Sequence, residues 1–356
     1  MRIGIYRSCG IGDAVQLTPL FQQIRADLPQ AEVTFFTSAN VAGVLEGCPL
    51  IDQTVTFSAS SITGAAAEWG GLPIWHKISR HGAWDVFLDL EPRWRRSLGF
   101  PLVRAARKGG LQSEGWKPLR LFDEYLSLDR AGLDRGHSSE RYLELWRNLT
   151  GYQDRGFSYD LSYLQDSATP LPQLPSRFVC LVPGAGNPMN PGEAKRWPFD
   201  SWLRLAERLS SEGFSPVWLG SPDDARQFPV PAVALNLMGQ LDLRQNYQII
   251  ARSVALIGND SGLFHVALAT RAKAVGLFGP TNPQRTGPFR NPNALVLKAG
   301  FGRVDRSILE QIKAGTAMDA LDSCVPMSQL DLELVSHEVI RFLTSTSTRQ
   351  QNNSST

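Results

Sequence analysis

Cysteine, long apolar runs and net charge are all scarce in this sequence of 356 residues. The four cysteines lie far apart and form no Cys-x-x-Cys pair, which argues against a disulfide framework or a zinc site and favours a reducing, cytoplasmic setting. No apolar run approaches the roughly 20 residues that a membrane helix needs, and the N-terminus has no signal-peptide layout. The formal net charge of +2 argues against a dedicated nucleic-acid binder.

Lysine is rare as well, because 29 of the 36 basic residues are arginine. Arginine holds carboxylates and phosphates through a planar fork of donors, so this bias favours anionic ligands. The alternative is that the bias reflects only a GC-rich genome.

Apolar runs of strand length alternate with helical patterns, which implies crossover connections and parallel sheets. The expected strands are 3–6, 33–36, 51–57, 86–90, 178–182, 216–219, 254–258 and 274–278. A stretch rich in Pro and Ser divides the pattern into two halves, each long enough for its own core. We therefore predict two Rossmann-like doubly wound α/β domains facing a central cleft. The expected parts are an N-terminal domain (1–165), a linker (166–176), a C-terminal domain (177–327), a closing amphipathic helix (328–343) and a disordered tail (344–356).

Ligands bind doubly wound sheets at the carboxyl ends of the strands, so the loops after the predicted strands are informative. The first loop, Arg7–Asp13, has two glycines but not a dinucleotide fingerprint: the third glycine is replaced by Val15, and no acid follows the second strand. Asp13 places a carboxylate at the mouth of the cleft. The alternative is that Asp13 only caps the following helix. Cys9 has no His partner and fits a small buried thiol better than a nucleophile.

The second loop, 183–198, is unusually long and carries Lys195 and Arg196 just before a helix. Backbone amides together with a lysine suit a phosphate group. The alternative is a surface loop with solvated charges.

The third loop, Gly220–Ala225, contains Asp223 and Asp224. Their carboxylates are candidates to accept hydrogen bonds from ribose hydroxyls. Equally, both fit acids of a first helical turn that favour the helix dipole.

The fourth loop contains Asp260, Gly262 and His265 at one helix entrance. Gly262 exposes amides that attract a diphosphate, and His265 shares that face of the first turn. A lone histidine is more often structural, but the three residues together favour a binding site. The loop after the next strand, Gly279–Pro283, contains Thr281 and supplies a rigid neighbouring wall.

These motifs, in this order, resemble those of glycosyltransferase family 9, the heptosyltransferases of lipopolysaccharide core assembly. The matching segments are Ile11–Asp13, Thr18–Pro19, Trp84–Asp89, Pro183–Ala185, Lys195–Pro198, Asp260–His265 and Gly279–Pro283. The resemblance implies the two-domain fold called GT-B. It also implies an inverting transfer of heptose from ADP-heptose, as substrate and not cofactor, to a Kdo–lipid A or inner-core acceptor.

The resemblance also implies a role for each matching residue. Asp13 would be the general base of the acceptor-side domain, and Lys195 would hold the donor phosphates. The remaining donor-site residues would be Asp223 or Asp224 at the ribose, with Asp260, Gly262, His265 and Thr281. Asp13 is then expected to face Lys195 and His265 across a gap one sugar wide.

The acceptor side and the metal requirement rest on fewer residues. Arg93, Arg95 and Arg96, with Arg104, Arg107 and Lys108 beyond them, are expected to face the cleft or a membrane and to hold an acidic glycolipid. The alternative is a solvated helix face. No Asp-x-Asp occurs to supply clustered oxygen ligands, so we expect a site without a metal.

We further expect a monomer with weak peripheral membrane contact and no nucleic-acid partner. Two rival interpretations are a nonhydrolysing sugar-nucleotide epimerase and a catalytically silent nucleotide-sugar-binding protein. A Rossmann oxidoreductase is disfavoured by the missing third glycine.

Overall fold

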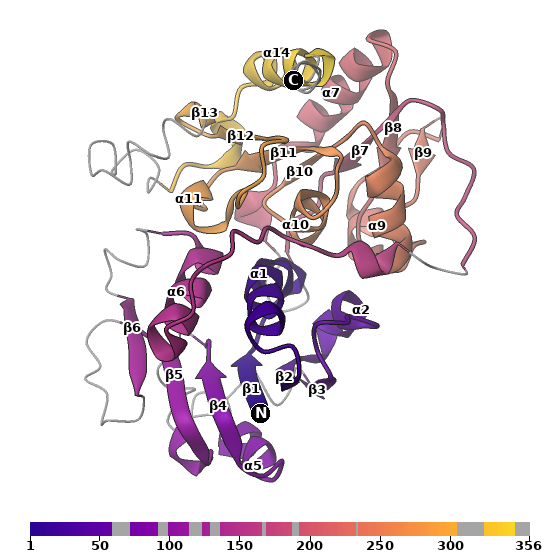
Figure 1. The fold of residues 1–356 in the computed structure, drawn as a ribbon. Helices are drawn as coiled ribbons and strands as arrows, with labels where there is room; N and C mark the ends of the chain where they lie inside the picture. The colour runs from indigo at the N-terminus through magenta and orange to yellow at the C-terminus, as the bar shows by residue number, and fades with distance from the viewer. Residues whose placement is uncertain are drawn as a thin grey trace, which may run out of the picture.

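The fold consists of two α/β lobes that meet along a pair of helices (Figure 1). The computed structural model describes residues 1–58, 72–91, 99–113, 123–128, 136–165, 169–186, 192–232, 234–304 and 324–345. Within these ranges, no helix combines the length and the apolar character that crossing a membrane requires.

The first lobe is built on a six-stranded sheet of order β3-β2-β1-β4-β5-β6, in which all pairs are parallel. Its strands are β1 (Arg2–Arg7), β2 (Glu32–Ser38), β3 (Gln53–Phe57), β4 (Trp84–Asp89), β5 (Ala105–Ser113) and β6 (Glu124–Leu128). The order reverses beside β1, which places the loop after β1 at a topological switch point.

Both faces of this sheet are covered, because successive side chains of each strand point to opposite sides. Ile3 and Ile5 face the helices α1 (Ile11–Asp27), α2 (Ala42–Leu45) and α6 (Ser138–Thr150). Tyr6 instead faces an aromatic cluster with α5 (Leu72–Ser79) and the short helix η3 (Phe100–Leu102). The sheet is thus buried on both faces, so a ligand can reach only the loops at the ends of its strands.

The second lobe is built on a seven-stranded sheet of order β13-β12-β11-β10-β7-β8-β9. Its strands are β7 (Phe178–Val182), β8 (Ser215–Trp218), β9 (Leu235–Asn236), β10 (Ala255–Asn259), β11 (Lys273–Phe278), β12 (Ala294–Lys298) and β13 (Gly302–Val304). Every pair is parallel except β12 with β13 at the edge.

The helices of the second lobe lie on both faces of its sheet (Figure 1). On the outer face, α7 (Phe199–Ser211) and α14 (Leu332–Thr344) share one apolar cluster. On the inner face, α9 (Leu243–Arg252) and α10 (Gly262–Leu268) belong to the cluster that also contains the core of the first lobe. Two short helices, α8 (Pro222–Gln227) and α11 (Pro283–Thr286), follow β8 and β11.

The predicted fold class is confirmed: both lobes are parallel α/β sheets wound on two sides. The closing helix α14 begins at Leu332, a few residues later than expected. It begins there because the carboxylate of Asp331 caps it by accepting a hydrogen bond from the N–H of Leu334. The domain and linker boundaries stay predictions. Of the expected disordered tail, residues 346–356 lie outside the described part of the chain.

Candidate active site

The first turns of α1 and α10 touch where the two lobes meet. A Cβ added at Gly12 would lie 2.5 Å from Cδ2 of His265, and one added at Gly262 would lie 3.0 Å from Cβ of Ile11. Two helix ends can approach this closely because each presents a glycine. The lobes are therefore in direct contact at these two glycines, and the expected gap of one sugar between Asp13 and Lys195 stays a prediction.

Asp13 lies in the first turn of α1 with both carboxylate oxygens held. Oδ1 accepts a hydrogen bond from an Nη of Arg7 at 3.1 Å, and Oδ2 accepts one from the N–H of Gly10 at 3.1 Å. Burial alone would raise the pKa of Asp13, but the Arg7 guanidinium and the Gly10 N–H outweigh burial and lower the pKa. Asp13 thus caps its helix, as the alternative interpretation held, and also stands as a carboxylate next to the opposite lobe.

Asp260 is the centre of a charged group in the second lobe. Its Oδ2 accepts a hydrogen bond from Nζ of Lys195 at 2.9 Å, and its Oδ1 lies 3.4 Å from Nε2 of His265. Burial would raise the pKa of Asp260, but the hydrogen bond from His265 and the charge of Lys195 lower the pKa well below its ordinary value. The structure thus brings together three predicted donor-site residues around one ionised carboxylate.

Three buried polar atoms at this edge lack a hydrogen-bond partner among the residues that the structure describes. They are Oγ of Ser261, Nδ1 of His265 and Oγ1 of Thr281. Buried polar atoms are nearly always paired, so three unpaired atoms on two neighbouring loops indicate a ligand that supplies the partners. Thr281 and His265 were predicted, whereas Ser261 was missed although it directly precedes Gly262.

Asn259, at the end of β10, ties the loop of Lys195 to this group. Its Nδ2 donates to the carbonyl of Pro183 at 2.7 Å, and its Oδ1 accepts from the N–H of Trp197 at 3.2 Å. Both ends of the long 183–198 loop are thereby fixed against the end of β10. These bonds explain how Lys195 reaches Asp260. Asn259 was missed from the sequence because its two partners lie more than 60 positions away along the chain.

The structure separates the two candidate ribose contacts. Asp224 is buried, caps α8 through Ser221, and lies so close to Gly184 that a Cβ there would be 2.3 Å from its carboxylate. Asp223 is exposed and forms an ion pair with Arg226. Asp224 therefore lies next to the 183–198 loop, for which phosphate binding was predicted, whereas Asp223 is exposed to solvent.

The structure describes only some of the basic residues that were expected on the acceptor side. Arg93, Arg95 and Arg96 lie outside the described residues. The expectation that the residues beyond them face the cleft is wrong for Arg104 and Arg107, because β5 runs parallel to β4 and begins beside Trp84. These arginines therefore lie toward the amino end of the sheet, away from the loop after β1.

Cys9 is a structural residue of the loop after β1. Its side chain is buried with Sγ 3.3 Å from Oγ1 of Thr37, and burial raises the pKa of its thiol to about 12. A protonated, buried thiol is a poor nucleophile, which agrees with the interpretation drawn from the sequence.

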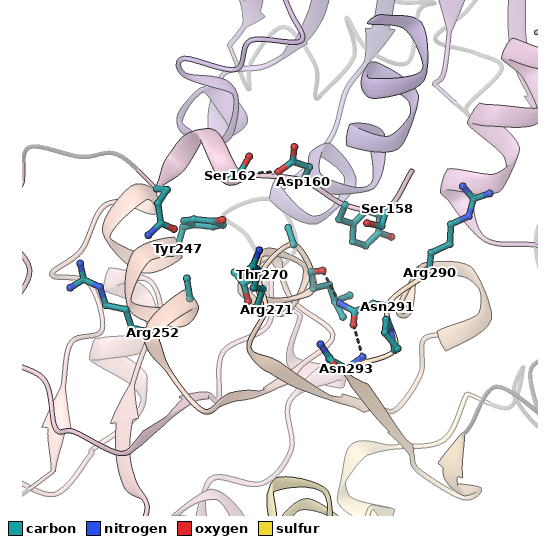
Figure 2. A pocket seen from close by; sticks show the side chains of 16 residues that line it. Ser158, Asp160, Ser162, Tyr247, Arg252, Thr270, Arg271, Arg290, Asn291 and Asn293 are labelled. Atoms are coloured by element: carbon teal, nitrogen blue, oxygen red, sulfur yellow. Dashed lines mark hydrogen bonds between the residues drawn. The ribbon is translucent and has the colours of Figure 1, made fainter. Parts of the chain in front are cut away.

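A cavity of about 700 Å³ lies at the other end of α10, between the lobes. It is lined by Leu268–Arg271 of the second lobe and by Ser158–Asp160 of the segment that follows α6 (Figure 2). Figure 2 shows the guanidinium groups of Arg252 and Arg290 turned away from its centre. None of the predicted site residues lines it, so the cavity is separate from the site at Gly12 and Gly262.

Among the residues that the structure describes, no three His, Cys, Asp or Glu side chains gather as a metal site requires. The site instead combines a carboxylate on one lobe, a lysine–carboxylate–histidine group on the other, and unpaired donors and acceptors between two loops.

Two parallel α/β lobes that meet at the carboxyl ends of their strands form a fold of the GT-B type. The sequence profile of glycosyltransferase family 9 (heptosyltransferase) matches residues 74–306, and the chain belongs to this family. The family resemblance seen in the motifs, and the assignment as a glycosyltransferase, are thereby confirmed.

Known relatives cover the chain almost end to end. A lipopolysaccharide heptosyltransferase 2 of Salmonella typhimurium is 26% identical over 330 residues, which are 85% of this chain and 90% of that protein. A family 9 glycosyltransferase structure from Veillonella parvula has a TM-score of 0.70 at 20% identity and covers 96% of this chain and 97% of its own. An E. coli heptosyltransferase solved with ADP has a TM-score of 0.66 at 17% identity, covering 96% of this chain and 100% of its own.

Proposed function

We propose that this protein is an inverting, metal-independent glycosyltransferase that moves a heptose from ADP-heptose to a lipopolysaccharide inner-core acceptor, either Kdo–lipid A or a heptose. Membership of family 9 supports the transfer of a heptose. The relative named as a lipopolysaccharide heptosyltransferase and the similar fold solved with ADP support the acceptor class and the nucleotide.

The observation that carries the proposal is the meeting of Asp13 with the polar edge of the second lobe. The contact between Gly12 and His265 supports this, because Asp13 directly follows Gly12, and His265 shares Asp260 with Lys195. A base on one side and a cation with free hydrogen-bonding atoms on the other are what a single displacement at an anomeric carbon needs.

Lys195 is the proposed partner of the donor diphosphate. In the structure the ammonium of Lys195 forms an ion pair with Asp260. When a donor is bound, the same ammonium would also stabilise the negative charge that develops on the leaving diphosphate. Ser261, Thr281 and Nδ1 of His265 supply further hydrogen bonds, and Gly262, which has no side chain, lets Ile11 of the first lobe pack beside them. A diphosphate whose charge is matched leaves without a general acid, so a second carboxylate of the glycosidase kind is unnecessary.

Asp13 is the proposed general base that takes the proton of the acceptor hydroxyl. Its lowered pKa makes it a weak base, which is sufficient if the proton moves late, after the sugar has become oxocarbenium-like. Asp224 is the better placed of the two ribose candidates because it adjoins Gly184. Attack from the first lobe and departure toward the second invert the anomeric centre.

The acceptor side of the proposal rests on Arg93, Arg95 and Arg96, which would hold acidic Kdo or phosphate groups. Because the acceptor is a lipid, we propose that the enzyme works at the inner face of the cytoplasmic membrane as a monomer in weak peripheral contact. No metal is required by this scheme, since Lys195 and hydrogen bonds supply the charge match.

The test is transfer by the purified protein from ADP-heptose to Kdo–lipid A and to a heptosylated acceptor, with and without EDTA, and with the product anomer read by NMR. We expect one acceptor to be heptosylated with inversion, and EDTA to leave the rate unchanged. Asp13→Asn should lose about 10²–10⁴-fold in turnover while ADP affinity by calorimetry stays within about twofold. Donor conversion without an acceptor would indicate an epimerase, and ADP binding without turnover on any acceptor would indicate a silent binding protein.

A further inference from the structure

Arg7, the last residue of β1, joins the sheet to the carboxylate of Asp13. One Nη donates to the carbonyl of Leu90 at 2.9 Å, just past the end of β4, and the other donates to Oδ1 of Asp13 at 3.1 Å. The side chain is only 13% exposed. Because β1 and β4 are paired strands, the guanidinium is anchored to the two middle strands of the sheet.

We infer that Arg7 is a positioning residue that fixes the orientation of the Asp13 carboxylate toward the acceptor hydroxyl. This inference rests on the proposed role of Asp13 as the base. The Gly10 N–H holds only Oδ2, so without Arg7 the carboxylate is free to turn about that one bond. With Arg7 in place, each oxygen has one fixed partner and keeps a second lone pair for a hydroxyl. A base held in this way meets the acceptor in one geometry.

The titratable groups around Asp13 come from three elements and from the loops after β1 and β4. Arg7 is on β1, His265 is on α10, Tyr142 is on α6, and Glu91 follows β4 beside Arg7; the thiol of Cys9 lies nearby. Arg7 is the strongest of the groups that lower the pKa of Asp13, ahead of the Gly10 N–H and His265. Burial opposes this effect, so removing Arg7 leaves burial to raise the pKa of Asp13.

Two substitutions separate the charge of Arg7 from its geometry. Arg7→Gln removes the charge and keeps most of the volume. Arg7→Lys keeps the charge but replaces the planar guanidinium with a single ammonium. One ammonium nitrogen cannot reproduce the two coplanar hydrogen bonds to Leu90 and Asp13. Arg25→Gln is the matched control. Arg25 also donates to a carbonyl and to a carboxylate, those of Ala31 and Asp52, but it lies at the other end of α1.

The experiment measures kcat, KM for ADP-heptose and the pH profile of kcat/KM for the full-length variants, with folding checked by circular dichroism. For Arg7→Gln we expect kcat to fall by about 10- to 100-fold, KM for the donor to stay within about threefold, and the acidic limb of the profile to move to higher pH. Arg7→Lys should leave the acidic limb near its wild-type position and recover part of kcat. Arg25→Gln should match the wild type in all three.

The inference is overturned if Arg7→Gln keeps the wild-type kcat and acidic limb while Asp13→Asn is inactive. If Asp13→Asn instead retains full transfer, the proposed base itself is wrong, and the role of Arg7 fails with it. Should Arg7→Gln fail to fold, Arg7→Lys decides: wild-type kcat in that variant contradicts the need for a forked donor.

Discussion

Gly12 and His265 are in direct contact although they belong to different lobes. A methyl group at Gly12 would lie 2.5 Å from Cδ2 of the imidazole, closer than real Cβ contacts. The imidazole is also held by Asp260, whose Oδ1 lies 3.4 Å from Nε2. The position of Asp13, next along the chain from Gly12, is thereby tied to the loop that carries the proposed donor contacts.

We expect Gly12→Ala to impair transfer because the added methyl group displaces the His265 ring or separates the two helix ends. Turnover should fall by at least about 10-fold, whereas the fold should persist. Gly136→Ala is the control, since a Cβ at Gly136 meets only Nε of Arg141 at 3.8 Å, an ordinary contact. Steady-state kinetics of the two variants decide the matter: equal activity in both would show that the contact has no part in catalysis.

Lys195→Met should weaken ADP binding by about 10- to 100-fold, because a charge-assisted hydrogen bond to phosphate is lost and Asp260 is left without its cation. Calorimetric titration with ADP measures the affinity. Lys77→Met, an exposed lysine on α5, is the control and should bind ADP as the wild type does. Unchanged affinity in Lys195→Met would remove Lys195 from the donor site.

Asp224→Asn and Asp223→Asn form a matched pair for the ribose contact. Asp224 is buried against Gly184, so losing its charge should reduce ADP affinity by about 10-fold. Asp223 pairs only with Arg226 at the surface, so its substitution should change affinity by less than about twofold. The reverse order of effects, measured by calorimetry, would reassign the contact to Asp223.

Asp260 should make stability depend on pH in the acidic range. Its pKa is lowered in the folded state, so the folded protein gains stability above the unfolded-state pKa and loses that gain progressively as the pH falls below about 4. Asp260→Asn should therefore lower Tm by about 5 °C at pH 7, and the difference should shrink steadily as the pH is lowered from about 4. A difference in Tm that is constant with pH would contradict an ionised network at this residue.

Much of the fold could be predicted because its central strands are buried on both faces and read as apolar runs. The strand predicted at 178–182 has the observed bounds of β7, and the strand expected at 274–278 differs from β11 by one residue. In contrast, β5 was missed because its sequence, AARKGGLQS, has no apolar run. It becomes a strand by pairing with β4, a tertiary effect that local pattern does not record.

The candidate site was predictable where one loop carries the whole pattern, as with Asp260, Gly262 and His265. It was not predictable where residues distant in sequence combine. The contact of Gly12 with His265 depends on how the lobes dock, and the bond of Arg7 to Asp13 crosses from a strand to a helix, where no helical spacing applies. Ser261 was identified only because its hydroxyl is buried and unpaired.

The cavity at the far end of α10 has a practical consequence for inhibiting this enzyme. Its walls come from both lobes, and none of the proposed donor contacts lines it. A compound bound in this cavity would oppose any movement of one lobe relative to the other. It would still leave the nucleotide free to bind. Its inhibition would be noncompetitive with the proposed donor, ADP-heptose, and a high concentration of the donor would not displace it.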